Sequence, residues 1–138
     1  MARSDRIVVG ASVVVKWFVE EENTEKALDI LDNYSEGKVD LISAQLMPFE
    51  VMNSLRYNPT LGIQDIMRIG ESLSKLQIGL FPLVDGLYAQ SMRIAIEYGT
   101  TVYDASYLSP AISADCLMYT SDAKFAGKVG RNEHLVLL

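Results

Sequence analysis

The sequence is poor in cysteine and histidine and has no long apolar run. Cys116 is the only cysteine, so no disulfide can form within the chain, which is usual for cytoplasmic proteins. His134 is the only histidine, so histidine-based acid–base catalysis is not expected. No apolar run approaches the ~20 residues that span a bilayer, and the polar start of the chain lacks the pattern of a signal peptide. We therefore expect a cytoplasmic protein that does not associate with a membrane.

Basic residues are also scarce. The 138 residues include 12 Lys and Arg against 18 Asp and Glu, a formal net charge of −6. Proteins that bind duplex DNA through its phosphates usually carry a basic face, and this composition argues against that mode of binding. The acidity does not exclude nucleic acid, because carboxylates clustered at a metal site add negative charge that the ion then offsets.

Short apolar runs alternate with helical patterns, without a linker, a repeat or a low-complexity segment. Strands are expected at residues 7–9, 39–43, 80–84, 116–119 and 134–138. Helices are expected at 13–19, 24–36, 48–57, 63–77, 86–98, 103–113 and 122–129. Ser12 is the expected N-cap of the first helix, Pro82 should push the third strand to a sheet edge, and Pro110 should interrupt or kink its helix. The pattern predicts one α/β domain over residues 1–138 with a mainly parallel sheet.

Three acidic residues stand where such a sheet gathers function. Glu50 lies in the first turns of the helix after the second strand, Asp104 opens a helix, and Asp122 follows the fourth strand. Each acid alone is explained by a favourable place near a helix N-terminus. Together, at the carboxyl ends of parallel strands, they would repel one another and need a cation. Carboxylates without histidine or cysteine suit Mg²⁺ or Mn²⁺, which activates water for attack on a phosphodiester.

Four segments carry a resemblance to a known family. They are residues 7–12 (IVVGAS), 47–55 (MPFEVMNSL), 101–108 (TVYDASYL) and 119–122 (YTSD), and together they resemble PIN domains, most of all the VapC toxins of toxin–antitoxin pairs. The resemblance implies a three-layer α/β/α sandwich whose acidic residues bind Mg²⁺ or Mn²⁺ and cut RNA. It also implies a homodimer and a cognate VapB-like antitoxin whose tail covers the site. The amphipathic stripe at residues 63–76 adds to the expectation of a dimer.

The resemblance assigns roles residue by residue. The expected metal-site acids are Glu50, Asp104 and Asp122, with Ser12 as the small hydroxyl beside the first acid, and Thr120 and Ser121 lining the site. From the sequence itself, Lys16 and Lys124 are candidates for holding substrate phosphates, although scattered surface charges explain them equally well.

The sequence departs from the family pattern at residue 10. Where the family places its first aspartate, at the end of the first strand, this chain has Gly10. Asp5 precedes the strand and would lie at the opposite end of the sheet, so it cannot substitute. We therefore expect a metal held less tightly and a weakened or inactive ribonuclease.

Two other functions remain open. One is a catalytically dead PIN domain that binds RNA or the antitoxin. The other is a small-molecule-binding α/β domain of flavodoxin or receiver type. The absence of a Gly-rich phosphate loop, with Gly10 standing alone where a dinucleotide-binding fold has G-x-G-x-x-G, weighs against the latter.

Overall fold

The structure is built on a sheet of five parallel strands. The computed structural model describes residues 5–138, so the expectations for residues 1–4 lie outside the described residues. The strands are β1 (Asp5–Val9), β2 (Val39–Ala44), β3 (Gly79–Phe81), β4 (Leu117–Thr120) and β5 (Leu135–Leu137), in the spatial order β3-β2-β1-β4-β5. The direction of chain progress reverses between β1 and β4. This topological switch point is where parallel sheets form ligand crevices.

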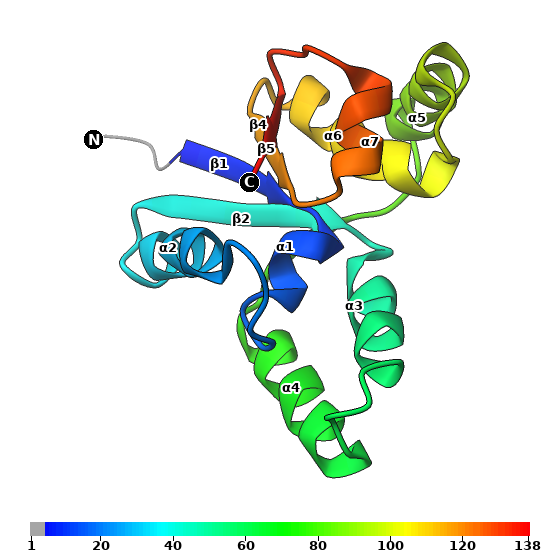
Figure 1. Cartoon of the computed structure of the whole chain (residues 1–138). Helices are drawn as coiled ribbons and strands as arrows, with labels where there is room; N and C mark the ends of the chain where they lie inside the picture. Colours follow the sequence, from blue (N-terminus) through cyan, green and yellow to red (C-terminus); the bar gives the residue numbers. More distant parts are fainter. Residues whose placement is uncertain (1–4) are drawn as a thin grey trace.

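Helices cover both faces of the sheet. They are α1 (Ala11–Val15), α2 (Thr24–Ser35), α3 (Met47–Arg56), α4 (Ile63–Lys75), α5 (Gly86–Tyr98), α6 (Val102–Ser113) and α7 (Ala123–Val129). In Figure 1, α5, α6 and α7 lie above the sheet and α1, α2 and α4 lie below it. This division follows from right-handed crossovers between parallel strands. The chain first adds β2 and β3 on one side of β1 and then β4 and β5 on the other side, so the helices of the later crossovers lie on the opposite face of the sheet. The expected three-layer α/β/α sandwich is confirmed.

Three helices, α3, α6 and α7, begin at the same edge of the sheet. Val8 and Val9 of the central strand β1 are fully buried, and α6 lies against β1, β2 and β4 through the fully buried Ala105, Leu108 and Ala111. A helix that leads into a parallel strand runs antiparallel to that strand, so α6 begins at the carboxyl edge of the sheet. The helices α3 and α7 follow β2 and β4 and begin at the same edge. All three helix starts therefore face the switch point.

Several expected boundaries are wrong. The first helix spans Ala11–Val15 and its N-cap is Gly10, not Ser12, because the Gly10 carbonyl already accepts hydrogen bonds from the N–H groups of Val13 and Val14. The third strand ends at Phe81, before Pro82, although its place at the sheet edge is confirmed. The helix α6 continues through Pro110 to Ser113 without an interruption. Within residues 5–138, no helix has both the length and the apolarity needed to cross a membrane.

Candidate active site

A cavity of about 240 Å³ opens beside the switch point. Its walls come from the segment after β1, from α3, from the start of α6 and from the end of β4, segments that lie far apart in the sequence. The residues that line it are Gly10, Ala11, Ser12, Val15, Glu50, Ser54, Asp104, Tyr107, Met118, Thr120, Asp122 and Phe125. The three acids expected to act together are thus on the wall of one cavity.

Two of these acids also have local structural roles. Asp122 is the N-cap of α7, and its Oδ1 accepts a hydrogen bond from the N–H of Phe125 at 3.0 Å. Asp104 lies in the first turn of α6, where its own N–H donates to Oγ1 of the N-cap residue Thr101 at 3.0 Å. Both acids therefore stand at a helix N-terminus, Asp122 as a cap and Asp104 in the first turn, and this is compatible with a site role because both helices begin at the cavity.

The negative charges of Asp104 and Asp122 repel each other. Burial raises the pKa of the Asp104 carboxyl, and the negative charge of Asp122 raises it further. A hydrogen bond from Thr101 and the positive charges of Lys128 and Lys124 act in the opposite direction. A cation between the two carboxylates would relieve their repulsion, which is the electrostatic signature of a site suited to a positive ligand.

Glu50 has a different partner. The phenol hydroxyl of Tyr107 donates a short hydrogen bond to Oε1 of Glu50. Tyr107 is only 3% exposed, and its pKa is raised by burial first and then by this hydrogen bond and the charge of Glu50. The sequence analysis did not single out Tyr107, although a signal was present, because it lies three residues after Asp104 and therefore on the same side of α6.

The donor set fits a hard divalent cation only in part. Carboxylate oxygens are the ligands that Mg²⁺ and Mn²⁺ prefer, and Mg²⁺ is commonly held by one or two carboxylates together with water. Asp104 and Asp122 meet that description. In the part of the chain that the structure describes, however, no three His, Cys, Asp or Glu side chains lie close enough together to hold a metal ion. Convergence of the three acids on one cavity is observed, and the three-carboxylate metal centre stays a prediction.

Gly10 leaves room where the resemblance expects an aspartate. A Cβ atom built at Gly10 would lie 3.4 Å from the Tyr119 carbonyl oxygen, 3.6 Å from Met118 Cε and 3.7 Å from Ser12 Oγ, which are ordinary contacts. The backbone at Gly10 is extended, with φ −74° and ψ 157°, a conformation open to any L residue. Neither space nor backbone geometry therefore requires a glycine at this position.

The hydroxyl groups in the cavity connect α1 to the end of β4. Ser12 Oγ accepts a hydrogen bond from the N–H of Ser121 at 2.8 Å and lies 3.4 Å from Thr120 Oγ1. Thr120 Oγ1 in turn accepts from the N–H of Asp122 at 3.0 Å. These contacts fix the backbone that carries Asp122, so Ser12 and Thr120 act on the site by positioning that acid.

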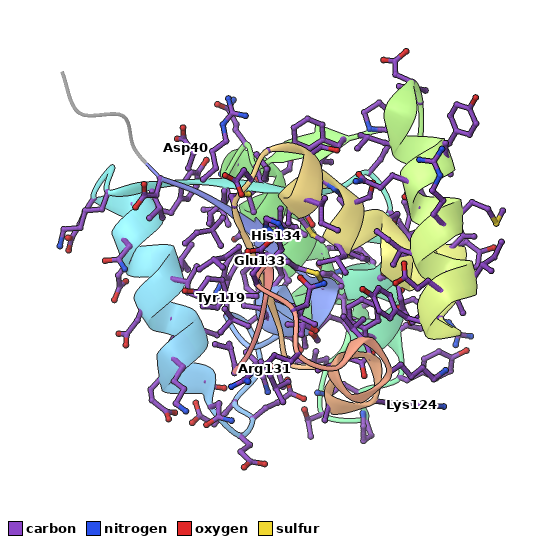
Figure 2. The ribbon with its side chains drawn as sticks, turned by 90° about the horizontal axis from the view of Figure 1, so that it is seen from above. Asp40, Tyr119, Lys124, Arg131, Glu133 and His134 are labelled. Carbon is purple, nitrogen blue, oxygen red and sulfur yellow. The ribbon has the colours of Figure 1, made fainter. Side chains whose placement is uncertain are left out.

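The remaining candidates lie apart from the cavity lining. The ammonium group of Lys16 donates to the Glu22 carbonyl at 2.6 Å and lies 3.8 Å from the Glu21 carboxylate, and Lys16 is only 9% exposed. Ser121 Oγ is buried, without a hydrogen-bond partner among the described residues. Lys124 projects from α7 at the outside of the molecule (Figure 2), where its charge still acts on Asp104. Of these three side chains, only that of Lys124 is shown to act on an acid of the cavity through its charge.

Comparison with known proteins identifies the fold family. A chain of a toxin–antitoxin complex from Klebsiella pneumoniae is 15% identical, with 94% of this chain and 95% of that chain covered and a TM-score of 0.70. PAE2754 from Pyrobaculum aerophilum is 25% identical, with coverage of 99% and 91% and a TM-score of 0.66. A chain of VapBC-5 from Mycobacterium tuberculosis is 16% identical, with coverage of 96% and 97% and a TM-score of 0.60.

The sequence comparisons give one match to a family and none to a single protein. No curated protein matches the chain significantly. The model of the PIN domain matches residues 7–129, which include all four segments that carried the resemblance. The chain belongs to the PIN domain family.

Proposed function

We propose that this chain is a VapC-like toxin, a divalent-metal-dependent endoribonuclease that is paired with an antitoxin. The observation that carries the proposal is the convergence of Glu50, Asp104 and Asp122 on one cavity at the switch point of the sheet. Support comes from the family match over residues 7–129 and from the fold shared with chains of toxin–antitoxin complexes.

The residues of the cavity would have different roles in the reaction. Asp104 and Asp122 would hold Mg²⁺ or Mn²⁺, and such an ion supplies a water of lowered pKa and positive charge for the phosphodiester. Glu50 lines the same cavity and accepts a hydrogen bond from Tyr107, which orients its carboxylate. Thr120 and Ser12 hold the Asp122 backbone in place. Lys124 lies near enough to Asp104 to attract the RNA backbone to the same edge of the sheet.

We infer that the activity is weak because one carboxylate is missing. Gly10 lines the cavity without contributing a ligand, and Glu50 is engaged by Tyr107. The same two observations favour the second candidate function, a catalytically dead PIN domain that binds RNA or the antitoxin. Both functions use the same surface and differ only in whether the bound RNA is cut.

A cleavage assay with matched variants separates the two functions. We expect the purified chain to cut single-stranded RNA slowly with Mn²⁺ and not at all with a chelator, and Asp104→Asn to abolish the cleavage. Gly10→Asp should increase it. If only Gly10→Asp cuts RNA, the chain as it stands is a binding module. If Asp104→Asn cuts as fast as the unsubstituted chain, the activity does not come from this site and the proposal fails.

We propose two protein partners, a second copy of the chain and an antitoxin. Apolar side chains remain outside the core on α4 and α5, among them Ile63 at 68%, Met67 at 59% and Ile96 at 76% exposed. We expect light scattering at tens of micromolar protein to give the mass of a dimer, and a monomer mass would contradict the assembly.

For the antitoxin, we expect a short reading frame for a small DNA-binding protein directly upstream of the gene. As a cytoplasmic protein the chain would keep the Cys116 thiol reduced.

A further inference from the structure

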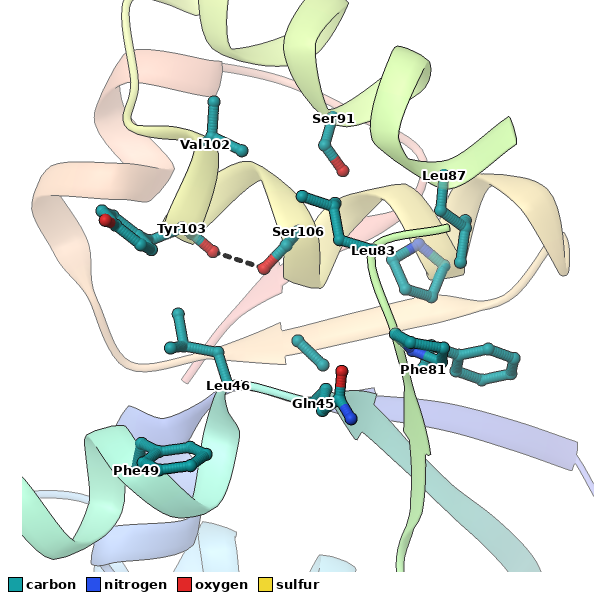
Figure 3. Close-up of a pocket in the computed structure, with 13 residues that line it drawn as sticks. Gln45, Leu46, Phe49, Phe81, Leu83, Leu87, Ser91, Val102, Tyr103 and Ser106 are labelled. Carbon is teal, nitrogen blue, oxygen red and sulfur yellow. Dashed lines mark hydrogen bonds between the residues drawn. The ribbon is translucent and has the colours of Figure 1, made fainter. Parts of the chain in front are cut away.

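A second cavity lies next to the acidic one. It measures about 340 Å³ and lies between α5 and α6 on one side and the ends of β2 and β3 with the start of α3 on the other (Figure 3). Its size is within the range of small-molecule pockets, and its lining is mostly apolar, with Leu46, Leu83, Leu87 and Val102 among its walls. The proposed nuclease chemistry makes no use of it.

The two cavities are built on the same two helices. Phe49 lines the apolar cavity, and the next residue of α3, Glu50, lines the acidic one. In α6, Tyr103 and Asp104 are divided between the cavities in the same way. A strand of RNA with its backbone at Glu50 and Asp104 therefore has a neighbouring nucleotide within reach of the apolar cavity.

Two largely exposed aromatic side chains lie at this cavity. Phe49 is 73% exposed and Tyr103 is 65% exposed, although both belong to well-formed helices. Figure 3 shows the two rings on the same side of the cavity, one from α3 and one from α6. Exposed aromatic rings bind unpaired bases by stacking, which tolerates any sequence because every base has a π face.

The cavity also contains a polar group without a partner. Ser91 on α5 is fully buried, and its hydroxyl has no hydrogen-bond partner among the described residues. Figure 3 shows the Ser91 side chain directed from α5 toward the cavity. A buried hydroxyl without a partner is costly, and a ligand with a polar edge would supply the missing hydrogen bond. A nucleobase has such an edge.

We propose that this cavity binds an unpaired nucleobase of the RNA, next to the phosphodiester that a cation at Asp104 and Asp122 would hold. Phe49 and Tyr103 stack on the base, and Ser91 makes a hydrogen bond to its edge. The inference rests on the proposed function and adds to it a pocket for the base beside the reacting phosphate, which a base paired in a continuous duplex could not enter.

Binding in a chelator tests the pocket without cleavage. The probe is a set of short fluorescent oligoribonucleotides of a single base each, measured by anisotropy. We expect Phe49→Ala and Tyr103→Ala each to weaken binding roughly five- to 150-fold, the range for loss of one stacked aromatic ring. The matched control is Tyr57→Ala, since Tyr57 is 70% exposed at the end of α3 and lines neither cavity. Ser91→Ala removes an unpartnered hydroxyl and should reduce the preference among the four bases while the fold is retained.

The outcomes separate the pocket from the nuclease. Loss of binding in Phe49→Ala and Tyr103→Ala, with Tyr57→Ala unchanged, supports the base pocket. If all variants bind RNA equally, the pocket proposal is wrong while the nuclease stands. If Phe49→Ala and Tyr103→Ala turn a dimer into a monomer and leave RNA affinity unchanged, the cavity is a subunit contact and the proposal is also overturned. If the unsubstituted chain binds no oligonucleotide in chelator, the pocket proposal fails, and the cleavage assay with Mn²⁺ decides separately whether the nuclease proposal holds.

Discussion

Replacement of Gly10 by aspartate is the most direct test of the site. The backbone accepts the change, since a Cβ atom at this position meets its nearest neighbour, the Tyr119 carbonyl oxygen, at 3.4 Å. In a backbone conformation that other residues adopt freely, removal of a glycine stabilises a fold by about 0.4 to 1 kcal/mol through the unfolded state. Shape alone therefore predicts a small gain in stability.

Charge acts in the opposite direction. The new carboxylate would join Glu50, Asp104 and Asp122 on the wall of one cavity, where the pKa of Asp104 is already raised by burial and by Asp122. At an effective dielectric of about 20, two like charges that share one small cavity repel each other by about 2 to 3 kcal/mol before screening by salt. After the backbone gain is subtracted, a net loss of about 1 to 2 kcal/mol is expected. For a chain of this size that lowers the melting temperature by about 3 to 10 °C.

A divalent cation should reverse that loss. A ligand that binds only the folded state at 100 times its Kd stabilises it by about 2.7 kcal/mol, so Mn²⁺ should raise the melting temperature of Gly10→Asp more than that of the glycine protein. Gly10→Asn is the matched control, because it has the same shape without the charge and should melt at or slightly above the unsubstituted chain. RNA cleavage by the same three proteins should be fastest for Gly10→Asp.

Two results would refute this reasoning. If Gly10→Asp and Gly10→Asn melt at the same temperature in chelator, the fourth carboxylate does not interact with the other three. If the glycine protein cuts RNA as fast as the aspartate protein, position 10 is not a ligand position in this chain.

Three further substitutions probe the contacts around the acids. Tyr107→Phe keeps the ring but loses the hydrogen bond to Glu50, so it should lower the free energy of unfolding by about 1 to 2 kcal/mol in urea titrations, and an unchanged midpoint would contradict the contact. Asp104→Asn should melt above the unsubstituted chain at pH 7, because a carboxyl whose pKa is raised in the folded state destabilises the fold once the pH rises through that pKa and the group ionises. The gain in melting temperature should disappear as the pH falls below 3.8, the ordinary pKa of the carboxyl. A gain that does not depend on pH would exclude this cause. Ser12→Ala removes the acceptor for the Ser121 N–H and should cost about 1 to 2 kcal/mol, measured by the same urea titration, while equal stability would show that water replaces the hydroxyl.

Local sequence predicted the order of the elements because each one carries its own periodicity. The expected strand at 39–43 and helix at 24–36 differ from β2 and α2 by a single residue at one end. The errors arose where distant contacts decide. Ser12 has the chemistry of an N-cap, but its hydroxyl accepts from the N–H of Ser121, 109 residues further along the chain. No local pattern contains that pairing.

The same distinction between local pattern and distant contacts holds for the candidate site. Strand ends and helix starts were sufficient to bring Glu50, Asp104 and Asp122 to one cavity, because parallel strands present all their carboxyl ends at one edge. The side-chain contacts within the cavity were not predictable in this way. The hydrogen bond between Tyr107 and Glu50 joins α6 to α3, and the salt contact of Lys16 with Glu21 takes its ammonium group away from the cavity. Placement of the backbone is a property of topology, whereas these pairings depend on the packed structure.

Residue 10 shows why the fold accepts either a glycine or an aspartate at this position. The N–H of Gly10 donates to the Tyr119 carbonyl at 2.9 Å, which continues the pairing of β1 with β4, and its carbonyl accepts from Val13 and Val14 at the start of α1. Both hydrogen-bonding roles belong to main-chain atoms and need no side chain. An aspartate at this position would make the same two contacts and would add only its carboxylate, directed to a cavity that already holds three. The architecture at residue 10 is therefore held by main-chain atoms, whereas its side chain sets the charge in the cavity, so a change of side chain here is expected to alter the site while the sheet and helices stay in place.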